Sequence, residues 1–213
     1  MKSRLMGIAL LSSLLCSSAN AGGFFGADVG STFGYPDSTG PLASAIVNAG
    51  YSSANAQQKS GTLGISIFGG SWFSENAGWE FGYAHLGGGI DGTFSATGPT
   101  VAGTYNYTAS AFHWAFLGGT KVGSGKLYGK AGLYRASTES KWAFTAGPTS
   151  SAAGSNSNMG LMLGAGYEAP LSEKLSTRFG ADIYNGVDFQ EVSNGAAVKQ
   201  TLYRIGFGLL YSY

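Results

Sequence analysis

The chain has 213 residues, a length that suits one domain. Only 11% of its residues are charged, against ~25% in an ordinary soluble domain, and its 36 glycines are about twice the usual share. No apolar run outside the extreme N-terminus reaches the ~20 residues of a membrane helix, so the composition excludes a helical membrane protein.

Residues 1–21 are predicted to form a cleaved secretory signal peptide. Lys2 and Arg4 give a charged start, residues 5–15 form a short apolar core, and Ala19 and Ala21 supply a small-x-small cleavage site. The apolar run is too short for a membrane anchor. We therefore expect the mature chain, residues 22–213, to be exported.

The single cysteine, Cys16, lies inside this signal peptide. A lipoprotein is not expected, because Leu14 and Leu15 precede Cys16 where a lipobox requires small residues. Removal of the signal leaves ten basic residues against eleven acidic ones, a net charge of −1. The mature chain therefore has no disulfides or cysteine metal sites, and its charge argues against a nucleic-acid partner.

Eight segments of the mature chain alternate between large apolar and small or polar residues, which is the period of a half-buried strand. In the first segment Phe25, Val29 and Tyr35 share one face, and Asp28 lies on the other. The predicted strands cover about residues 22–35, 60–73, 78–94, 103–120, 126–144, 156–169, 175–185 and 201–213.

The segment 103–120 is ambiguous. Tyr105 and Leu117 belong to one phase of the alternation, and Phe112, Trp114 and Phe116 belong to the other. Either the interior holds these three aromatic side chains, or a bulge near Ser110 shifts the register. The sequence leaves both alternatives open.

The connections between the predicted strands alternate in length. Short turns are expected at 74–77, 121–125 and 170–174, and longer polar loops at 36–59, 95–102, 145–155 and 186–197. Short turns on one side, long loops on the other and an even strand number are typical of transmembrane barrels. The predicted fold is all-β, an eight-stranded antiparallel up-and-down transmembrane β-barrel that fills residues 22–213.

The final segment, Thr201–Tyr213, carries the pattern Gly208-x-x-Tyr211-x-Tyr213. This pattern resembles the C-terminal signal of bacterial outer-membrane barrels, in which the last strand closes the barrel against the first. The resemblance implies that Gly208, Tyr211 and Tyr213 serve closure and insertion, with the barrel-assembly machinery as a partner.

Three further segments resemble the transmembrane domain of the outer-membrane protein A (OmpA) family: GWEFGYAHLG at 78–87, LYGKAGL at 127–133 and GYEAPLSEKLSTR at 166–178. Their order and spacing match the family over nearly the whole mature chain. Two departures stand out. Full-length members carry a periplasmic peptidoglycan-binding domain after the barrel, which is not expected here, and the family's inward lysine on the fourth strand falls near Phe116.

The alternation places seven charged residues on the inward face. They are Asp28, Glu80, Lys130, Glu168, Arg178, Asp182 and Arg204. Buried charges need partners, so we expect a salt-bridge network in the interior. By resemblance to the OmpA interior, the expected pairs are Glu80 with Arg178 and Lys130 with Glu168. Such a network either fills the lumen and fixes the register, or forms a switchable gate for small ions.

Catalysis is not expected. His85 falls on the lipid-facing phase, and His113 has no serine two residues on. No Gly-x-Ser-x-Gly motif, metal-ligand spacing or phosphate loop is present, so neither a metal nor a cofactor is predicted. A lipid-modifying enzyme of the outer membrane is the least favoured function.

Aromatic residues near the predicted strand ends are expected to form belts at both membrane interfaces. They are Tyr35, Trp79, Tyr83, Tyr203, Tyr211 and Tyr213. The resemblance implies the outer membrane of a Gram-negative bacterium, with membrane lipid and lipopolysaccharide as neighbours. We expect a structural or surface-contact role, with the loops at 36–59 and 145–155 meeting host surfaces or phage. A low-conductance gated pore is the alternative.

Overall fold

The computed structural model of the protein describes residues 22–51, 53–58, 62–97, 101–146, 151–190 and 196–213. The elements in chain order are β1 (Gly22–Phe33), α2 (Thr39–Asn48), β2 (Ser53–Gln58), β3 (Thr62–Trp72), β4 (Ala77–Thr97), β5 (Val101–Val122), β6 (Gly125–Ala146), β7 (Ser151–Pro170), β8 (Leu175–Gln190) and β9 (Ala197–Ser212). The segments that alternate in the sequence are the long strands of this series.

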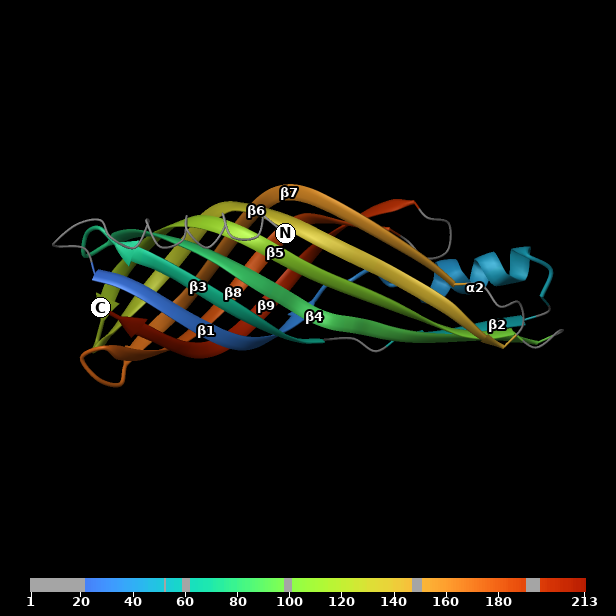
Figure 1. Ribbon diagram of the computed structural model, residues 1–213, viewed down its shortest axis with the longest axis horizontal. Helices are drawn as coiled ribbons and strands as arrows, with labels where there is room; N and C mark the ends of the chain where they lie inside the picture. The colour runs from blue at the N-terminus through green and yellow to red at the C-terminus, as the bar shows by residue number, and fades with distance from the viewer. Residues whose placement is uncertain (1–21, 52, 59–61, 98–100, 147–150, 191–195) are drawn as a thin grey trace, which may run out of the picture.

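In the described part of the chain, eight strands form a closed antiparallel ring, and β2 adds to it by pairing with β4 (Figure 1). Strand β1 lies between β3 and β9, and the hydrogen bond from Tyr213 N to Gly23 O, 3.0 Å long, ends the seam. Closure pairs the two edge strands of the ring with each other, which lipid requires because it offers backbone groups no partner. The predicted eight-stranded antiparallel barrel is confirmed.

The outward face of the ring is apolar. Phe207 on β9 is 55% exposed, whereas Glu80 on β4 and Arg178 on β8 are 0% and 4% exposed. Other exposed apolar side chains on this face are Phe25, Val29, Ile65, Ile67, Leu161, Leu163, Phe179, Ile205 and Leu209. Apolar residues outside and polar ones inside are the arrangement of a barrel in lipid.

Strand β5 decides between the two alternatives for the segment 103–120, and the alternative that places the three aromatic side chains inside is wrong. Its aromatic residues Phe112, Trp114 and Phe116 face outward, with exposures of 65%, 48% and 57%. A register shift does lie next to Ser110, which pairs with His85, but the extra residues are on β4 and the pairing of β5 with β6 is regular there. The predicted irregularity is thus present in the partner strand, and it does not change the phase of β5.

The phase of β5 is constant, but the chemistry of its two faces reverses near Ser110. Before this point Tyr105 and Tyr107 are buried inside, and Thr104 faces out. After it, small residues such as Ala115 face the interior and aromatic residues face out. A strand surrounded by water turns its apolar side chains inward, whereas a strand surrounded by lipid turns them outward. The reversal therefore marks where the strand leaves the bilayer.

The two ends of the barrel differ in the length of their connections. The turns that join β3 to β4, β5 to β6 and β7 to β8 lie at the end that holds the C-terminus (Figure 1). At the other end, strands β4 to β7 run to between 20 and 22 residues. Because ~9–11 residues cross a bilayer, about half of each of these strands projects beyond it.

The predicted polar loop at 36–59 contains structure. Its segment α2 lies at the projecting end of the barrel (Figure 1), with Leu42 and Ile46 buried, and β2 pairs with the outer part of β4. No helix in the described ranges is long and apolar enough to cross a membrane. The mildly apolar middle of this loop is thus the buried face of α2.

Tyr35 does not belong to an interfacial belt, so that prediction was wrong. Its ring is 7% exposed and its hydroxyl donates to Leu86 O over 3.0 Å. The preceding residue, Gly34, has φ of +92°, a conformation that a side chain disfavours. This turn of the backbone interrupts the alternation and directs Tyr35 inward.

The interior is layered. Near the short turns, Phe24, Phe68, Leu117, Tyr128 and Leu210 form a small apolar cluster. The predicted charged residues lie between this cluster and the projecting half of the barrel. The projecting half holds a larger apolar cluster, whose most buried members include Tyr105, Tyr107, Tyr134, Tyr184, Phe189 and Leu202. The barrel is therefore filled by side chains along its length, as eight strands allow.

Gly208 lies at the β1–β9 seam, where neighbouring atoms leave no room for a side chain. A Cβ at this position would lie 2.1 Å from Ala27 O and 2.5 Å from Asp28 Cβ. We expect Gly208→Val to lower the free energy of unfolding by about 1–3 kcal/mol through overpacking. Urea titration of the heat-modifiable band on unboiled gels measures this change.

The matched control is Ala165→Val, at an exposed outward position on β7. The control should unfold as the unmodified chain does. An equal urea midpoint for Gly208→Val and Ala165→Val would contradict the proposed tightness of the seam.

Candidate functional site

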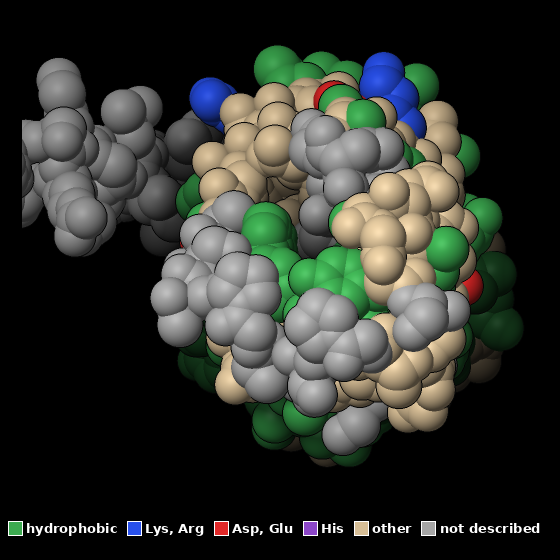
Figure 2. Space-filling view, turned by 90° about the vertical axis from the view of Figure 1, so that its right-hand side faces the viewer, with side chains coloured by type: hydrophobic (Ala, Val, Ile, Leu, Met, Phe, Trp, Pro, Cys, Tyr) green, Lys and Arg blue, Asp and Glu red, His purple; other side chains and the backbone are tan. Residues whose placement is uncertain are grey.

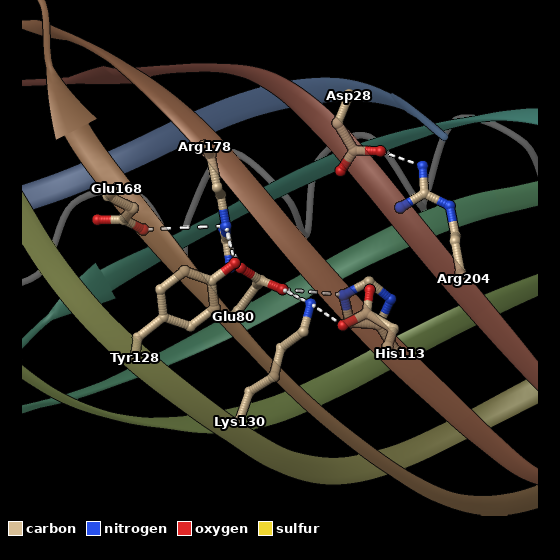
Figure 3. Close-up of polar contacts among 9 residues, drawn as sticks. Asp28, Glu80, His113, Tyr128, Lys130, Glu168, Arg178 and Arg204 are labelled. Atoms are coloured by element: carbon tan, nitrogen blue, oxygen red, sulfur yellow. Dashed lines mark hydrogen bonds and ion pairs between the residues drawn. The ribbon is translucent and has the colours of Figure 1, made fainter. Parts of the chain in front are cut away.

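The seven predicted interior charges all lie on the inward face of the barrel, and Figure 3 shows six of them labelled. They come from six strands: Asp28 from β1, Glu80 from β4, Lys130 from β6, Glu168 from β7, Arg178 and Asp182 from β8, and Arg204 from β9. Five of them form one connected set with His113 of β5, namely Glu80, Lys130, Glu168, Arg178 and Asp182. Asp28 and Arg204 stand apart as a pair.

Glu80 is the centre of this set, with its carboxylate shared by three nitrogen donors. Arg178 Nη1 lies 2.5 Å from Oε2, Lys130 Nζ lies 3.0 Å from Oε1, and His113 Nε2 lies 3.3 Å from Oε1. The side chain of Glu80 is fully buried. The structure thus contains the predicted pair between Glu80 and Arg178.

The predicted pair between Lys130 and Glu168 is wrong. Lys130 Nζ instead contacts Asp182 Oδ1 at 3.0 Å, in addition to Glu80. Glu168 Oε1 lies 3.9 Å from Arg178 Nε, nearer the short turns. Strand register explains the difference: Lys130 lies opposite Gly164 on β7, and Gly164 lies opposite Asp182 on β8. Because glycine leaves space there, Lys130 reaches Asp182.

The guanidinium of Arg178 is held by aromatic rings as well as by carboxylates. Its Nε donates to the Tyr128 hydroxyl over 2.6 Å, and its Cζ lies 4.3 Å and 4.4 Å from the ring centres of Tyr128 and Phe68. Cation–π contacts of this kind strengthen when they are desolvated. Arg178 therefore joins the charged layer to the apolar cluster below it.

Asp28 and Arg204 form a separate ion pair across the β1–β9 seam (Figure 3). Thr32 on β1 lies opposite Arg204 in the sheet, and Asp28 lies opposite Gly208. The Arg204 side chain therefore runs along the seam to meet Asp28. This charge pair fixes the register of the two strands that close the barrel.

His113 is the functional residue that sequence reasoning missed. It is buried on the inward face of β5, whereas Phe116, taken as the counterpart of the family's inward lysine, faces lipid. The small residues Ala109, Ala111 and Ala115 share the phase of His113. That run of small side chains was the signal in the sequence that this phase faces inward.

The lumen around these side chains is closed. The cavity lined by Asp28, Glu80, Lys130, Arg178, Asp182 and Arg204 has a volume of about 10 Å³, which is room for about one water molecule. Among the described residues, no three His, Cys, Asp or Glu side chains are grouped to hold a metal ion. Four acidic side chains thus face three basic ones, and little space remains among them.

The remaining predicted site residues lie elsewhere. Gly208 lies on the inward face of β9 at the seam, and Tyr211 and Tyr213 are exposed beside Phe25, with ring centres 5.4 Å and 6.5 Å from it. Ala19 and Ala21, the predicted cleavage site, lie outside the described residues. The signal peptide therefore stays a prediction.

Removal of the central carboxylate should destabilise the barrel. Glu80→Gln leaves Arg178 and Lys130 buried without their shared counter-charge, which we expect to cost about 3–5 kcal/mol. Urea unfolding in detergent micelles, followed by tryptophan fluorescence, measures the loss.

A matched control is available on the projecting surface. Glu139 and Lys141 form an exposed ion pair at 2.9 Å, so Glu139→Gln should change the free energy of unfolding by about 0–1 kcal/mol. If both variants unfold at the same urea concentration, the buried network does not stabilise the fold.

Comparison with known proteins agrees with this architecture. The family profile described as OmpA-like transmembrane domain matches residues 22–200. No curated protein sequence matches the chain. The solved structures to which the chain is similar include outer-membrane proteins.

Three of these structures have TM-scores of at least 0.50. Neisserial surface protein A scores 0.53 at 10% identity, covering 90% of this chain and 97% of its own. The attachment invasion locus protein Ail of Yersinia pestis scores 0.50 at 11% identity, covering 91% and 99%. OprG from Pseudomonas aeruginosa scores 0.50 at 12% identity, covering 90% and 96%. At such identities the likeness concerns the fold.

Proposed function

Because the chain belongs to the OmpA-like transmembrane domain family, we propose that it is a non-conducting barrel whose function is surface contact and support of the envelope. The protein lies in the bacterial outer membrane. One observation carries the proposal: the charged layer leaves a cavity of only about 10 Å³ in the lumen. A filled interior favours work at the surface over transport.

The projecting half offers the contact surface. The described part of the connection from Pro36 to Gln58 contains one charged residue, Asp37, and residues 151–155 contain none. In the view onto this end, most described side chains are uncharged (Figure 2). Recognition there would rest on hydrogen bonds and apolar contact, for lipopolysaccharide, a host surface or a phage. Such binding depends little on salt, because no long-range charge attraction is involved.

Two measurements test this proposal together. In planar bilayers the purified barrel should show no discrete conductance. On cells, replacement of residues 39–48 by a short Gly–Ser linker should reduce surface binding while the heat-modifiable band persists. Persistent single-channel openings, or binding that survives the replacement and that of residues 145–155, would contradict the surface role.

A gated pore is the second candidate, and one contact favours it. Glu80 is shared by Arg178, Lys130 and His113, so an exchange of partners among them would rearrange the lumen without stranding the carboxylate. For a gate, rare openings should be seen and should change in Glu80→Ala and Arg178→Ala. The surface role predicts silence in all three proteins.

The C-terminal strand is the proposed contact for the barrel-assembly machinery. Support comes from the exposed aromatic residues Tyr211 and Tyr213 beside the seam. Their place at the last strand to pair suits a recognition signal that is read before closure. Loss of insertion in a Tyr211→Ser, Tyr213→Ser double variant, with the chain retained in the periplasm, would support this partner.

The carboxylate of Asp37 accepts hydrogen bonds at the start of α2. Thr39 donates to Asp37 Oδ1 from its backbone N over 3.0 Å and from its hydroxyl over 2.7 Å. These hydrogen bonds hold the pKa of the Asp37 carboxyl below its ordinary value of 3.8. A carboxyl whose pKa is depressed in the folded state stabilises it above the unfolded pKa, and this contribution is lost as the pH falls through the folded pKa.

We therefore expect α2 to loosen below about pH 4, and Asp37→Ala to loosen it at neutral pH by about 0.5–1.5 kcal/mol, the usual net contribution of an intramolecular hydrogen bond. Amide hydrogen exchange of residues 42–48 measures this opening. Asp188→Ala, at a residue far along β8, serves as a control that should leave α2 unchanged. Identical exchange in Asp37→Ala and the unmodified chain would contradict a stabilising role of Asp37 at the start of α2.

A further inference from the structure

A furrow of about 730 Å³ crosses the outer wall of the barrel. Two rows of outward-facing residues border it, as the strand registers show. One row consists of Tyr211, Phe25, Gly69 and Phe81, and the other consists of Leu209, Ala27, Ile67 and Tyr83. The furrow therefore runs across β9, β1, β3 and β4, roughly along the direction of the interstrand hydrogen bonds.

Small residues among large ones create the hollow. Gly69 is the outward residue of β3 between Phe25 and Phe81, and Ala27 takes a corresponding place in the second row. Between the rows lie Gly26 and Gly82, whose side-chain positions face the interior. The walls are thus aromatic and aliphatic side chains, and the floor is largely backbone.

The furrow opens toward the end that bears the short turns. Its lining begins with Leu175, the first residue of β8, and Tyr211, and extends to Phe112 in the middle of β5. Short turns face the periplasm in barrels of this kind, so the open end meets the inner leaflet. Lys174, which precedes Leu175, is exposed at that end, and its carbonyl accepts a hydrogen bond from Ser212 N over 2.8 Å.

We propose that this furrow is a binding site for one acyl chain of an inner-leaflet phospholipid. The site is continuous with the lipid-facing surface, and its apolar walls suit a methylene chain. Lys174 is exposed in the turn next to Leu175, at the end of the furrow where the lipid phosphate would lie. An acyl chain seated between the two rows fills the gap at Gly69 and contacts the residues of both rows.

A photoreactive lipid tests the site. The unmodified barrel is reconstituted in phospholipid bilayers that contain phosphatidylethanolamine with a diazirine on one acyl chain. After irradiation, crosslinks should concentrate on the segments around Phe25, Ile67 and Phe81. Gly69→Leu, which fills the furrow, should reduce them about tenfold, the equivalent of ~1.4 kcal/mol.

The control is Ala165→Leu, an outward substitution on β7 on a different part of the wall. It should leave the crosslinks unchanged. Heat-modifiable migration reports folding, and Ala27→Leu replaces Gly69→Leu if that variant does not fold. Crosslinks spread evenly over the lipid-facing band, or unaffected by both furrow variants, overturn the proposal. Crosslinking between two chains at the furrow would assign it to a second copy and overturn it as well.

Discussion

The backbone of a sheet in lipid has no partner other than itself, and the structure follows from this constraint. The pairing of β1 with β9 removes the last open edge, which makes closure a condition of residence in the membrane. Closure in turn creates an interior that eight strands leave just wide enough for side chains. Both the charged layer and the apolar clusters occupy that space.

The charged layer carries a cost that its geometry offsets. Glu80, Arg178 and Lys130 are all removed from water, and burial of single charges is expensive. The Glu80 carboxylate is shared by Arg178, Lys130 and His113, so its charge does not depend on one base. The separate Asp28–Arg204 pair places a specific interaction at the seam, where a slip of one residue would turn every side chain to the wrong face.

The strands and the faces that they turn to lipid were predictable because apolar and polar residues alternate in the sequence with a period of two. Phe207 faces lipid and Glu80 faces the lumen, as the alternation indicates. The pairing of Lys130 was not predictable, because it depends on register between β6, β7 and β8 and on the space at Gly164. Register is a property of two strands together, and alternation within one strand does not specify it.

The misassigned residues of β5 have a different cause. A rule that places large residues in lipid holds only for the part of a strand that lipid surrounds. Tyr105 lies beyond that part, where water reverses the preference, and His113 lies within it on the inward side. Tyr35 escaped prediction because a single backbone turn at Gly34 breaks the period. Neither the level of the membrane surface nor such a turn is visible in alternation alone.

The reversal of the two faces along β5 also bears on biogenesis. The projecting half of the barrel has a water-exposed outer surface and an apolar interior. Its residues start on the periplasmic side, however, and must cross the bilayer to reach their final position. Thr104 and its neighbours are polar but uncharged, and each Lys, Arg, Asp or Glu carried through hydrocarbon adds to the barrier. The scarcity of charge in the projecting hairpins thus favours their translocation, a step that is complete once the barrel has folded.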